Sequence, residues 1–420
     1  MYWPEEWSDP EQLSLLHGTP INCLVTEREF PSAFIDRALR LGIEIVLKGT
    51  RAEVLWSGTS GAAWKSPAEV LAISDGVWPG VPATREDGGA SAGPTGVPWV
   101  DSNGWRIRLA LAMRPSKPVW IAVGSPKKVG VLRKEDYVLA VADAAAYGGR
   151  WVIWLDRELR DGLTQRSGNA LDVWRGIVET LRFFEQQSRQ QDFRPAATWG
   201  VVSDFSGGNE FLSHEILNLM MRRHLPFVIL EKSGAATADF EGLLAVVYPD
   251  REAPGRALER KLERFIRQGG LLVVNKNYPV PRSPSAGTDP YGRFRIQRLG
   301  KGRIAVSVQD LADPYLTVAD AHLILSRRHD LFRLYNGGSV YVYLTRGDRA
   351  GLTLIQLLNY AARSSANLIS LALRDKYRTA RFRSLEDPHG KYLELQSVEN
   401  GWFELHLPPF AVYALIELEG

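Results

Sequence analysis

Apolar and polar positions alternate with two different periods in the first half of the chain. Strand-sized apolar runs lie at 21–25, 43–47, 70–74, 117–123 and 151–155. Segments with one apolar helical face lie at 31–41, 103–113, 134–147 and 170–187. A repeat of strand and helix at this pitch is typical of a (β/α) barrel. Because only five or six strands can be counted, residues 1–195 are predicted to form an incomplete barrel or one with irregular units.

Residues 196–310 have the pattern of a second α/β unit. Four apolar runs have the length of strands: 199–203, 227–230, 243–248 and 271–274. One helix is predicted with an apolar face formed by Leu258, Leu262, Phe265 and Ile266, and with an end at Gly269. Continuously apolar strands are typical of a parallel sheet that helices cover on both faces. A flavodoxin-like, doubly wound domain is therefore expected.

Beyond about residue 336 the apolar period becomes two. Six short strands are predicted, at 340–344, 352–358, 368–373, 392–395, 402–407 and 412–418. Strands of this kind without intervening helices are typical of an antiparallel β-sandwich. The fold class is therefore a multidomain α/β protein with three parts, residues 1–195, 196–310 and 311–420.

Composition narrows the function classes. The chain has 420 residues, with 51 basic and 48 acidic side chains, and no basic run interleaved with aromatics, so nucleic acid is not an expected partner. One cysteine and no Cys/His cluster predict no disulfide within the chain, no metal site and no cofactor. The apolar runs are shorter than a membrane span, so no membrane partner is expected. The compartment stays open, although export is favoured if a signal peptide has been removed.

The order of the three parts resembles the glycoside hydrolases related to the family 42 β-galactosidases. The segments that carry the resemblance are GTPINCLV at 18–25, VS at 202–203, NL at 218–219, FIRQGG at 265–270, SRRHD at 326–330, LLNY at 357–360 and PFAVY at 409–413. The resemblance implies a carbohydrate substrate at the barrel mouth, cleaved by carboxylate acid/base chemistry. It also implies a homo-oligomer, either a dimer or a trimer.

Two departures from related families bear on the chemistry. The middle part resembles a class I glutamine amidotransferase domain, but the only cysteine, Cys23, lies far upstream, so this part has no nucleophile. Cys23 itself is expected to be a buried strand residue. Family 42 enzymes present their acid and nucleophile as glutamates after two later barrel strands, whereas the Asn209–Glu210 pair lies in the middle part. The alternative to a hydrolase is therefore a catalytically inactive carbohydrate-binding or oligomeric scaffold protein.

Four carboxylates follow predicted strands of the first part, where a barrel presents its active site. They are Asp156, Asp75, Asp101 and Glu27. Glycosidic cleavage requires one protonated and one ionised carboxyl group, which need unlike surroundings. Asp156 is the foremost candidate because two tryptophans precede it. The alternative for each is a helix N-cap, a position that aspartate favours, and this alternative is favoured for Asp101.

Tryptophan is abundant, with 13 residues, and its flat ring suits both sugar stacking and core packing. Core packing is the more common role, so only tryptophans beside strand ends are candidates for substrate binding. These are Trp78, Trp105 and Trp154. Lys48 and Arg157 are candidates for binding an acidic sugar, although surface ion pairs are their more common role.

Overall fold

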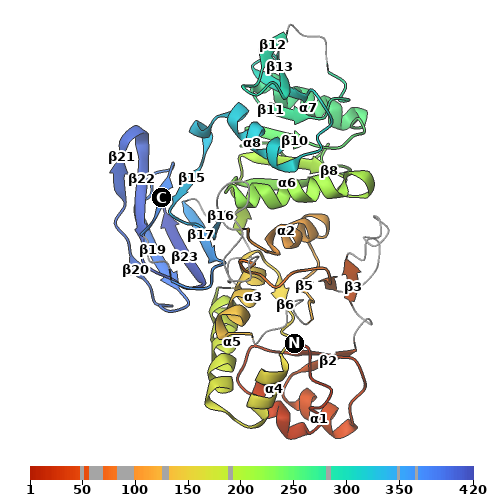
Figure 1. Cartoon of the computed structure of the whole chain (residues 1–420), viewed down its shortest axis with the longest axis vertical. Helices are drawn as coiled ribbons and strands as arrows, with labels where there is room; N and C mark the ends of the chain where they lie inside the picture. The colour runs from red at the N-terminus through yellow and green to blue at the C-terminus, as the bar shows by residue number, and fades with distance from the viewer. Residues whose placement is uncertain are drawn as a thin grey trace.

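The computed structural model describes residues 1–47, 52–55, 70–82, 99–124, 132–187, 193–280, 285–347, 351–364 and 368–420. The molecule is elongated, with the N-terminal part at one end, the middle α/β part at the other, and the C-terminal sheets beside the junction of the two (Figure 1). Parallel and antiparallel strands lie in separate sheets, apart from one mixed sheet in the middle part. The predicted class of a mixed α/β protein is confirmed.

The N-terminal part contains short parallel strands together with several helices. Its strands are β1 (Cys23–Thr26), β2 (Glu44–Leu47), β3 (Ala52–Leu55), β4 (Val70–Ile73), β5 (Val119–Ile121) and β6 (Arg150–Trp151). Its helices are η1 (Pro10–Leu16), α1 (Ser32–Arg40), α2 (Gly104–Met113), α3 (Lys134–Ala146), α4 (Arg157–Thr164) and α5 (Gly168–Gln186). The sheets are β1-β2 and β3-β4-β5-β6, both parallel.

The first residues of the chain connect these two sheets. The backbone N–H of Tyr2 donates to the carbonyl of Ile153 at 2.8 Å, and that of Trp3 donates to the carbonyl of Val25 at 2.9 Å. The strand expected at 151–155 is only two residues long in the sheet, Arg150 and Trp151. Closure of these strands into a barrel remains a prediction.

Strand β1 also explains the environment of the single cysteine. Its side chains alternate between the two faces, so Leu24 is fully buried whereas Cys23 on the opposite face is only half-buried. The strand position of Cys23 is as predicted, but the expected full burial is wrong.

The middle part has one seven-stranded sheet in the order β12-β13-β14-β11-β10-β8-β9. Its parallel strands are β8 (Trp199–Ser203), β9 (Phe227–Glu231), β10 (Ala245–Tyr248), β11 (Leu271–Val274) and β14 (Gly302–Ser307), and its antiparallel edge is β13 (Phe294–Leu299) with β12 (Ser285–Thr288). The order β9-β8-β10-β11-β14 is that of flavodoxin-like sheets. In these sheets the strand order reverses between the first and third strands, while the strands themselves stay parallel. Here that switch point lies between β8 and β10.

Helices cover both faces of this sheet. They are η4 (Gly207–Asn209), α6 (Glu210–Arg222), α7 (Arg256–Gln268) and α8 (Pro314–Leu325). Val201 and Val247 belong to the core cluster that contains α6 and α8 residues, whereas Val202 and Val246 belong to the cluster around α7. Both sets are buried, which explains why these strands are continuously apolar. The predicted apolar face and glycine end of α7 are confirmed.

Two antiparallel sheets pack together in the C-terminal part. One has the order β15 (Phe332–Tyr335), β18 (Ile369–Leu373), β22 (Trp402–Leu407), β21 (Gln396–Val398). The other has the order β20 (Lys391–Tyr392), β19 (Thr379–Ser384), β23 (Tyr413–Glu419), β17 (Leu352–Asn359), β16 (Val340–Gly347), β7 (Phe193–Pro195). The short helix η5 (Arg327–His329) connects α8 to β15, and η6 (Glu399–Gly401) connects β21 to β22. One core cluster joins both sheets, as expected for a β-sandwich.

The parts exchange elements at their edges. Strand β7, from the end of the first predicted part, pairs with β16 of the sandwich. Helix α8, whose residues fall in the third predicted part although no helix was expected there, packs against α6 of the middle part. The three-part division at 195 and 310 therefore stays a prediction.

Candidate functional site

A cleft lies between the carboxyl end of β4 and helix α6. It is lined by Asp75, Trp105, Arg106, Gly207, Glu210, Phe211, His214 and Glu215, and its volume is about 360 Å³. Asp75 follows β4 by two residues, whereas Trp105 and Arg106 open α2. This size lies within the range of small-molecule sites. The cleft therefore combines the carboxyl end of a strand of the N-terminal part with a helix of the middle part.

Local helix geometry brings the cleft residues together. In α6, Glu210, Phe211, His214 and Glu215 are spaced so that they share one helical side. The start of helix α2 lies close to the side chains of Tyr147 and Met221 because its first residue is Gly104. A Cβ atom at that position would lie 2.5 Å from the Tyr147 ring and 2.6 Å from the Met221 side chain.

Charge in the cleft centres on Arg106. Its Nε lies 3.9 Å from the Asp75 carboxylate, and its guanidinium stacks 4.4 Å from the centroid of the Trp105 ring. Removal of water by packing raises the pKa of Asp75 above its usual range, although Arg106 opposes the shift and 45% of the side chain stays exposed. Asp75 is therefore a partly exposed carboxyl group that retains its proton more readily than a free aspartate.

His214 closes the inner side of the cleft. Its ring lies 5.0 Å from the Trp105 ring and is buried. Burial, assisted by the positive charge of Arg106, lowers the pKa of His214 to about 4. The ring is therefore neutral at pH 7 and adds no charge to the cleft.

Asp156, the foremost sequence candidate, is the N-cap of α4. One carboxylate oxygen accepts from the Leu159 N–H at 2.7 Å and the other from the Leu132 N–H at 3.1 Å. Its neighbour Arg157 is 89% exposed and pairs with Asp161 at 3.6 Å. Neither Asp156 nor Arg157 lines the cleft. Asp156 therefore has the role of a helix N-cap, the alternative to a catalytic role.

The other predicted site residues lie in separate places. Glu27 is exposed beyond β1. Asp101 pairs through its backbone with Gly80, and the N-cap of α2 is Asn103, so the favoured capping role of Asp101 is wrong. Lys48 lies outside the described residues.

Among the predicted tryptophans, only Trp105 lines the cleft. The indole N–H of Trp78 donates to the Gly124 carbonyl at 2.8 Å, and its ring packs edge-on against Trp151 with centroids 5.0 Å apart. Trp154 is half-buried. The structure therefore brings Asp75 and Trp105 together and adds Arg106, Glu210, Phe211, His214 and Glu215. The Asn209–Glu210 pair was the local sequence signal for Glu210, but its place in the middle part gave no reason to expect it beside Asp75.

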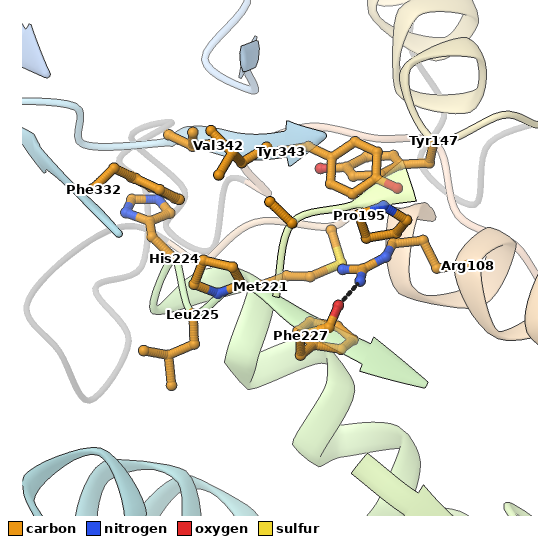
Figure 2. A pocket seen from close by; sticks show the side chains of 13 residues that line it. Arg108, Tyr147, Pro195, Met221, His224, Leu225, Phe227, Phe332, Val342 and Tyr343 are labelled. Carbon is orange, nitrogen blue, oxygen red and sulfur yellow. Dashed lines mark hydrogen bonds between the residues drawn. The ribbon is translucent and has the colours of Figure 1, made fainter. Parts of the chain in front are cut away.

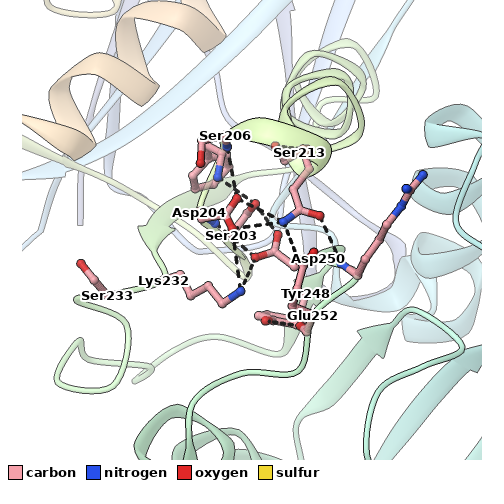
Figure 3. Close-up of polar contacts among 12 residues, drawn as sticks. Ser203, Asp204, Ser206, Ser213, Lys232, Ser233, Tyr248, Asp250 and Glu252 are labelled. Atoms are coloured by element: carbon pink, nitrogen blue, oxygen red, sulfur yellow. Dashed lines mark hydrogen bonds and ion pairs between the residues drawn. The ribbon is translucent and has the colours of Figure 1, made fainter. Parts of the chain in front are cut away.

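A second polar cluster occupies the switch point of the middle sheet (Figure 3). The Ser203 hydroxyl donates to one Asp250 oxygen at 2.5 Å, and the Lys232 ammonium donates to the other at 2.9 Å. The Asn209 amide donates to Asp204 at 3.1 Å and to Glu252 at 2.9 Å. Ser203 and the Asp250 side chain are fully buried. The Ser203 and Asp250 side chains are closed off from solvent, so the Ser203 hydroxyl has no access to a substrate.

An enclosed cavity lies where the three parts meet, with Arg108, Tyr147 and Tyr343 on one side and His224 and Phe332 on another (Figure 2). Arg108 donates to the Phe227 carbonyl, and its guanidinium stacks 3.9 Å from the centroid of the Phe227 ring. The cavity volume is about 20 Å³, enough for one water molecule and too small for a sugar.

Within the described ranges, no group of three or more His, Cys, Asp or Glu side chains is arranged to hold a metal ion. No helix in the same ranges is long and apolar enough to span a membrane.

Comparison with known proteins identifies relatives by fold alone. No family model matches the sequence, and a comparison with curated proteins finds no significant similarity. The structure is similar to the α-L-fucosidase isoenzyme 2 from Paenibacillus thiaminolyticus, with a TM-score of 0.56, 10% identity, and coverage of 98% of this chain and 79% of that chain.

Two other solved structures extend the comparison. A catalytic mutant of a GH42 β-galactosidase from G. stearothermophilus has a TM-score of 0.55 and 10% identity, with 92% of this chain and 66% of that chain covered. A rhamnosidase from Novosphingobium sp. PP1Y has a TM-score of 0.54 and 13% identity, with 92% and 38% covered. The chain thus spans about two thirds of the galactosidase and much less of the rhamnosidase. The predicted resemblance to GH42 β-galactosidases is confirmed as a relationship of fold.

Proposed function

We propose that the protein is a carbohydrate-active relative of the glycoside hydrolases and that it binds its saccharide in the cleft between β4 and α6. The fold shared with a fucosidase, a galactosidase and a rhamnosidase supports this class of ligand. The observation that carries the proposal is the position of Asp75, a carboxyl group with a raised pKa at the carboxyl end of a parallel strand.

In the hydrolytic form of this proposal, Asp75 acts as the general acid. A raised pKa lets the group carry a proton to the glycosidic oxygen as the bond to the sugar breaks. Glu210 or Glu215, across the cleft on α6, supplies the second carboxylate, which either attacks the anomeric carbon or activates water. Phe211, which is 70% exposed, offers a flat face for stacking on a sugar ring.

The charge of the cleft favours a neutral sugar or an amino sugar. Three carboxylates, from Asp75, Glu210 and Glu215, face one guanidinium, from Arg106, and His214 is neutral. Arg106 is already paired with Asp75. Like charge therefore disfavours a uronate or a sulfated sugar, whose negative groups have no unpaired cation among the lining residues.

Binding without hydrolysis is the second candidate. After the described strands β4 and β6, the first carboxylates are Asp75 and Asp156, and both oxygens of Asp156 are engaged as a helix cap. A pair of strand-end carboxylates, as the family 42 resemblance implies, is therefore absent from these strand ends. This observation favours a protein that recognises a saccharide and leaves it intact.

Asp75→Asn tests the proposal, with Asp156→Asn as the matched control. The probes are p-nitrophenyl glycosides of fucose, galactose and rhamnose for turnover, and the free sugars and their oligosaccharides for calorimetric binding. A hydrolase loses at least about 10²-fold in turnover with Asp75→Asn. A binding protein shows no turnover and loses about 5-fold to 100-fold in affinity. Asp156→Asn changes neither. Equal behaviour of the two variants removes Asp75 from the site.

A further inference from the structure

The turn that carries Asp75 is held by one buried amide. The Val77 N–H donates to the Asn103 side-chain oxygen at 2.8 Å, and the Asn103 side-chain N–H donates back to the Val77 carbonyl at 2.8 Å. Gly76 makes this approach possible, since a Cβ atom there would lie 3.0 Å from the same Asn103 oxygen and 2.8 Å from the Val123 side chain. Asn103 thus fixes the backbone two residues after Asp75.

Asn103 is held in turn by a buried carboxylate. One oxygen of Asp143 accepts from the Asn103 side-chain N–H at 2.8 Å and from its backbone N–H at 3.0 Å. The other accepts from the Tyr360 hydroxyl at 2.6 Å. Asn103 and Asp143 are 0% exposed and Tyr360 is 1% exposed. Tyr360 follows β17, so the chain of contacts starts in the β-sandwich.

We propose that Asp143 and Tyr360 are positioning residues for the cleft, through which the β-sandwich fixes the turn that presents Asp75. This inference rests on the function proposed for the cleft. The path runs from the Tyr360 hydroxyl to Asp143, then to Asn103, to the Val77 backbone and so to Asp75. Through this path the β-sandwich, which contributes no residue to the cleft lining, acts on the geometry of the site.

Packing alone does not require these groups. Asp143 lies in α3 among buried Val141, Ala142 and Ala144, where an apolar side chain fills space without the desolvation cost of a carboxylate. That cost is offset by the three hydrogen bonds that Asp143 accepts, and all of them come from residues of the proposed path. Nearby Tyr341 packs against Tyr360 with ring centroids 4.9 Å apart, yet among the described residues its buried hydroxyl has no hydrogen-bond partner.

Amide hydrogen exchange on the free protein tests the proposal without any saccharide. Tyr360→Phe removes only the hydroxyl, and exchange of a peptide spanning residues 74–80 is expected to rise about tenfold while that of β8 does not change. Tyr341→Phe, the matched control, leaves both peptides unchanged. Equal exchange of 74–80 in the wild type and in Tyr360→Phe overturns the proposal, as does an equal rise with Tyr341→Phe.

Substitutions at Asp143 separate positioning from general stability. Asp143→Asn retains an acceptor for Asn103 and can donate to the Tyr360 oxygen, so exchange of 74–80 stays within about threefold of the wild type. Asp143→Ala removes the contacts to both Asn103 and Tyr360, so it raises the exchange of 74–80 more than Tyr360→Phe does. If a chromogenic glycoside is turned over, Tyr360→Phe lowers kcat and leaves KM nearly unchanged. A protein that binds no sugar contradicts the proposed function and still leaves the exchange result interpretable.

Discussion

Asp75 and Asp250 both lie just beyond the carboxyl ends of parallel strands, β4 and β10, yet their surroundings differ completely. The Asp250 side chain is fully buried, and its two oxygens accept from Ser203 and Lys232 at 2.5 and 2.9 Å. Asp75 is 45% exposed, and Arg106 at 3.9 Å is its one ion-pair partner in the described part of the chain. A strand-end carboxylate is therefore a candidate site only when hydrogen bonds within the protein do not already occupy its oxygens.

Asp156 resembles Asp250, because the protein occupies both of its carboxylate oxygens. Backbone N–H groups occupy both of its oxygens, so its position after an aromatic strand does not make it reactive. The same reasoning applies to Ser203, whose hydroxyl is committed to Asp250.

Removal of Lys232 is expected to have the largest effect on stability. Lys232→Met leaves the buried Asp250 carboxylate without its cation, which costs about 3 kcal/mol in the free energy of unfolding. Lys276→Met is the control, because the Lys276–Asp310 pair at 3.1 Å is much more exposed and contributes less than about 1 kcal/mol. Urea unfolding measures both values. Similar losses in the two variants contradict the dependence of the buried Asp250 carboxylate on Lys232.

Protonation of Asp143 predicts a pH dependence. Burial raises the pKa of Asp143 to about 6 from a usual value of 3.8, although the hydrogen bonds from Tyr360 and Asn103 oppose the shift. The folded state therefore holds this proton more tightly than the unfolded chain. The stabilisation is complete below pH 3.8 and is lost as the pH rises to about 6, by about 3 kcal/mol in total.

Unfolding free energies measured between pH 4 and 7 check this dependence. The wild type minus Asp143→Asn difference isolates Asp143 from the buried histidines, which titrate in the opposite direction because the pKa values of His214 and His224 are lowered to about 4. A difference that does not change with pH argues against a raised pKa at Asp143.

Truncation of the two strand-end aspartates separates a cap from a cleft residue. Asp156→Ala is expected to cost about 1 kcal/mol in the free energy of unfolding, because α4 loses its N-cap, and Asp156→Asn costs less because asparagine is also a good cap. Asp75→Ala changes the free energy of unfolding by less than about 0.5 kcal/mol. Thermal unfolding at pH 7 compares the three variants. Destabilisation by Asp75→Ala alone reverses the assignment of the two roles.

Phe211 gives the smallest expected effect. Phe211→Ala removes the exposed ring beside the cleft and is expected to weaken saccharide binding by about 1 kcal/mol without loss of stability. Tyr392→Ala is the control, because Tyr392 is equally exposed, at 72%, and lies on the sandwich. Calorimetric titration with the sugar found in the screen measures both affinities. Equal affinities exclude Phe211 as a stacking surface.

Hydrophobic periodicity determined most of the elements by itself. The apolar face of α7 was predicted residue by residue, because Leu258, Leu262, Phe265 and Ile266 repeat at helical spacing and Gly269 ends the helix with φ of +127°. Short strands were less predictable. β6 has two residues in place of the expected five, since pairing with neighbours that are distant in sequence sets the length of a strand.

The candidate site depended on the tertiary structure. The sequence identified Asp75 and Trp105 from their positions beside expected elements, but it ranked Asp156 above Asp75 because it cannot show which carboxylate oxygens are occupied. Asp143 was not predicted. Its place as a lone aspartate in the apolar run of α3 is the sequence feature that could have indicated it.

Local pattern therefore determined the elements and the carboxylates at their ends, because periodicity and capping act over a few residues. Only the packing of α6 on α2, and of the Tyr360 loop on α3, decided which of those carboxylates faces a cleft. Both contacts join residues more than 100 positions apart, and such contacts depend on the shapes of entire elements, which no local pattern records.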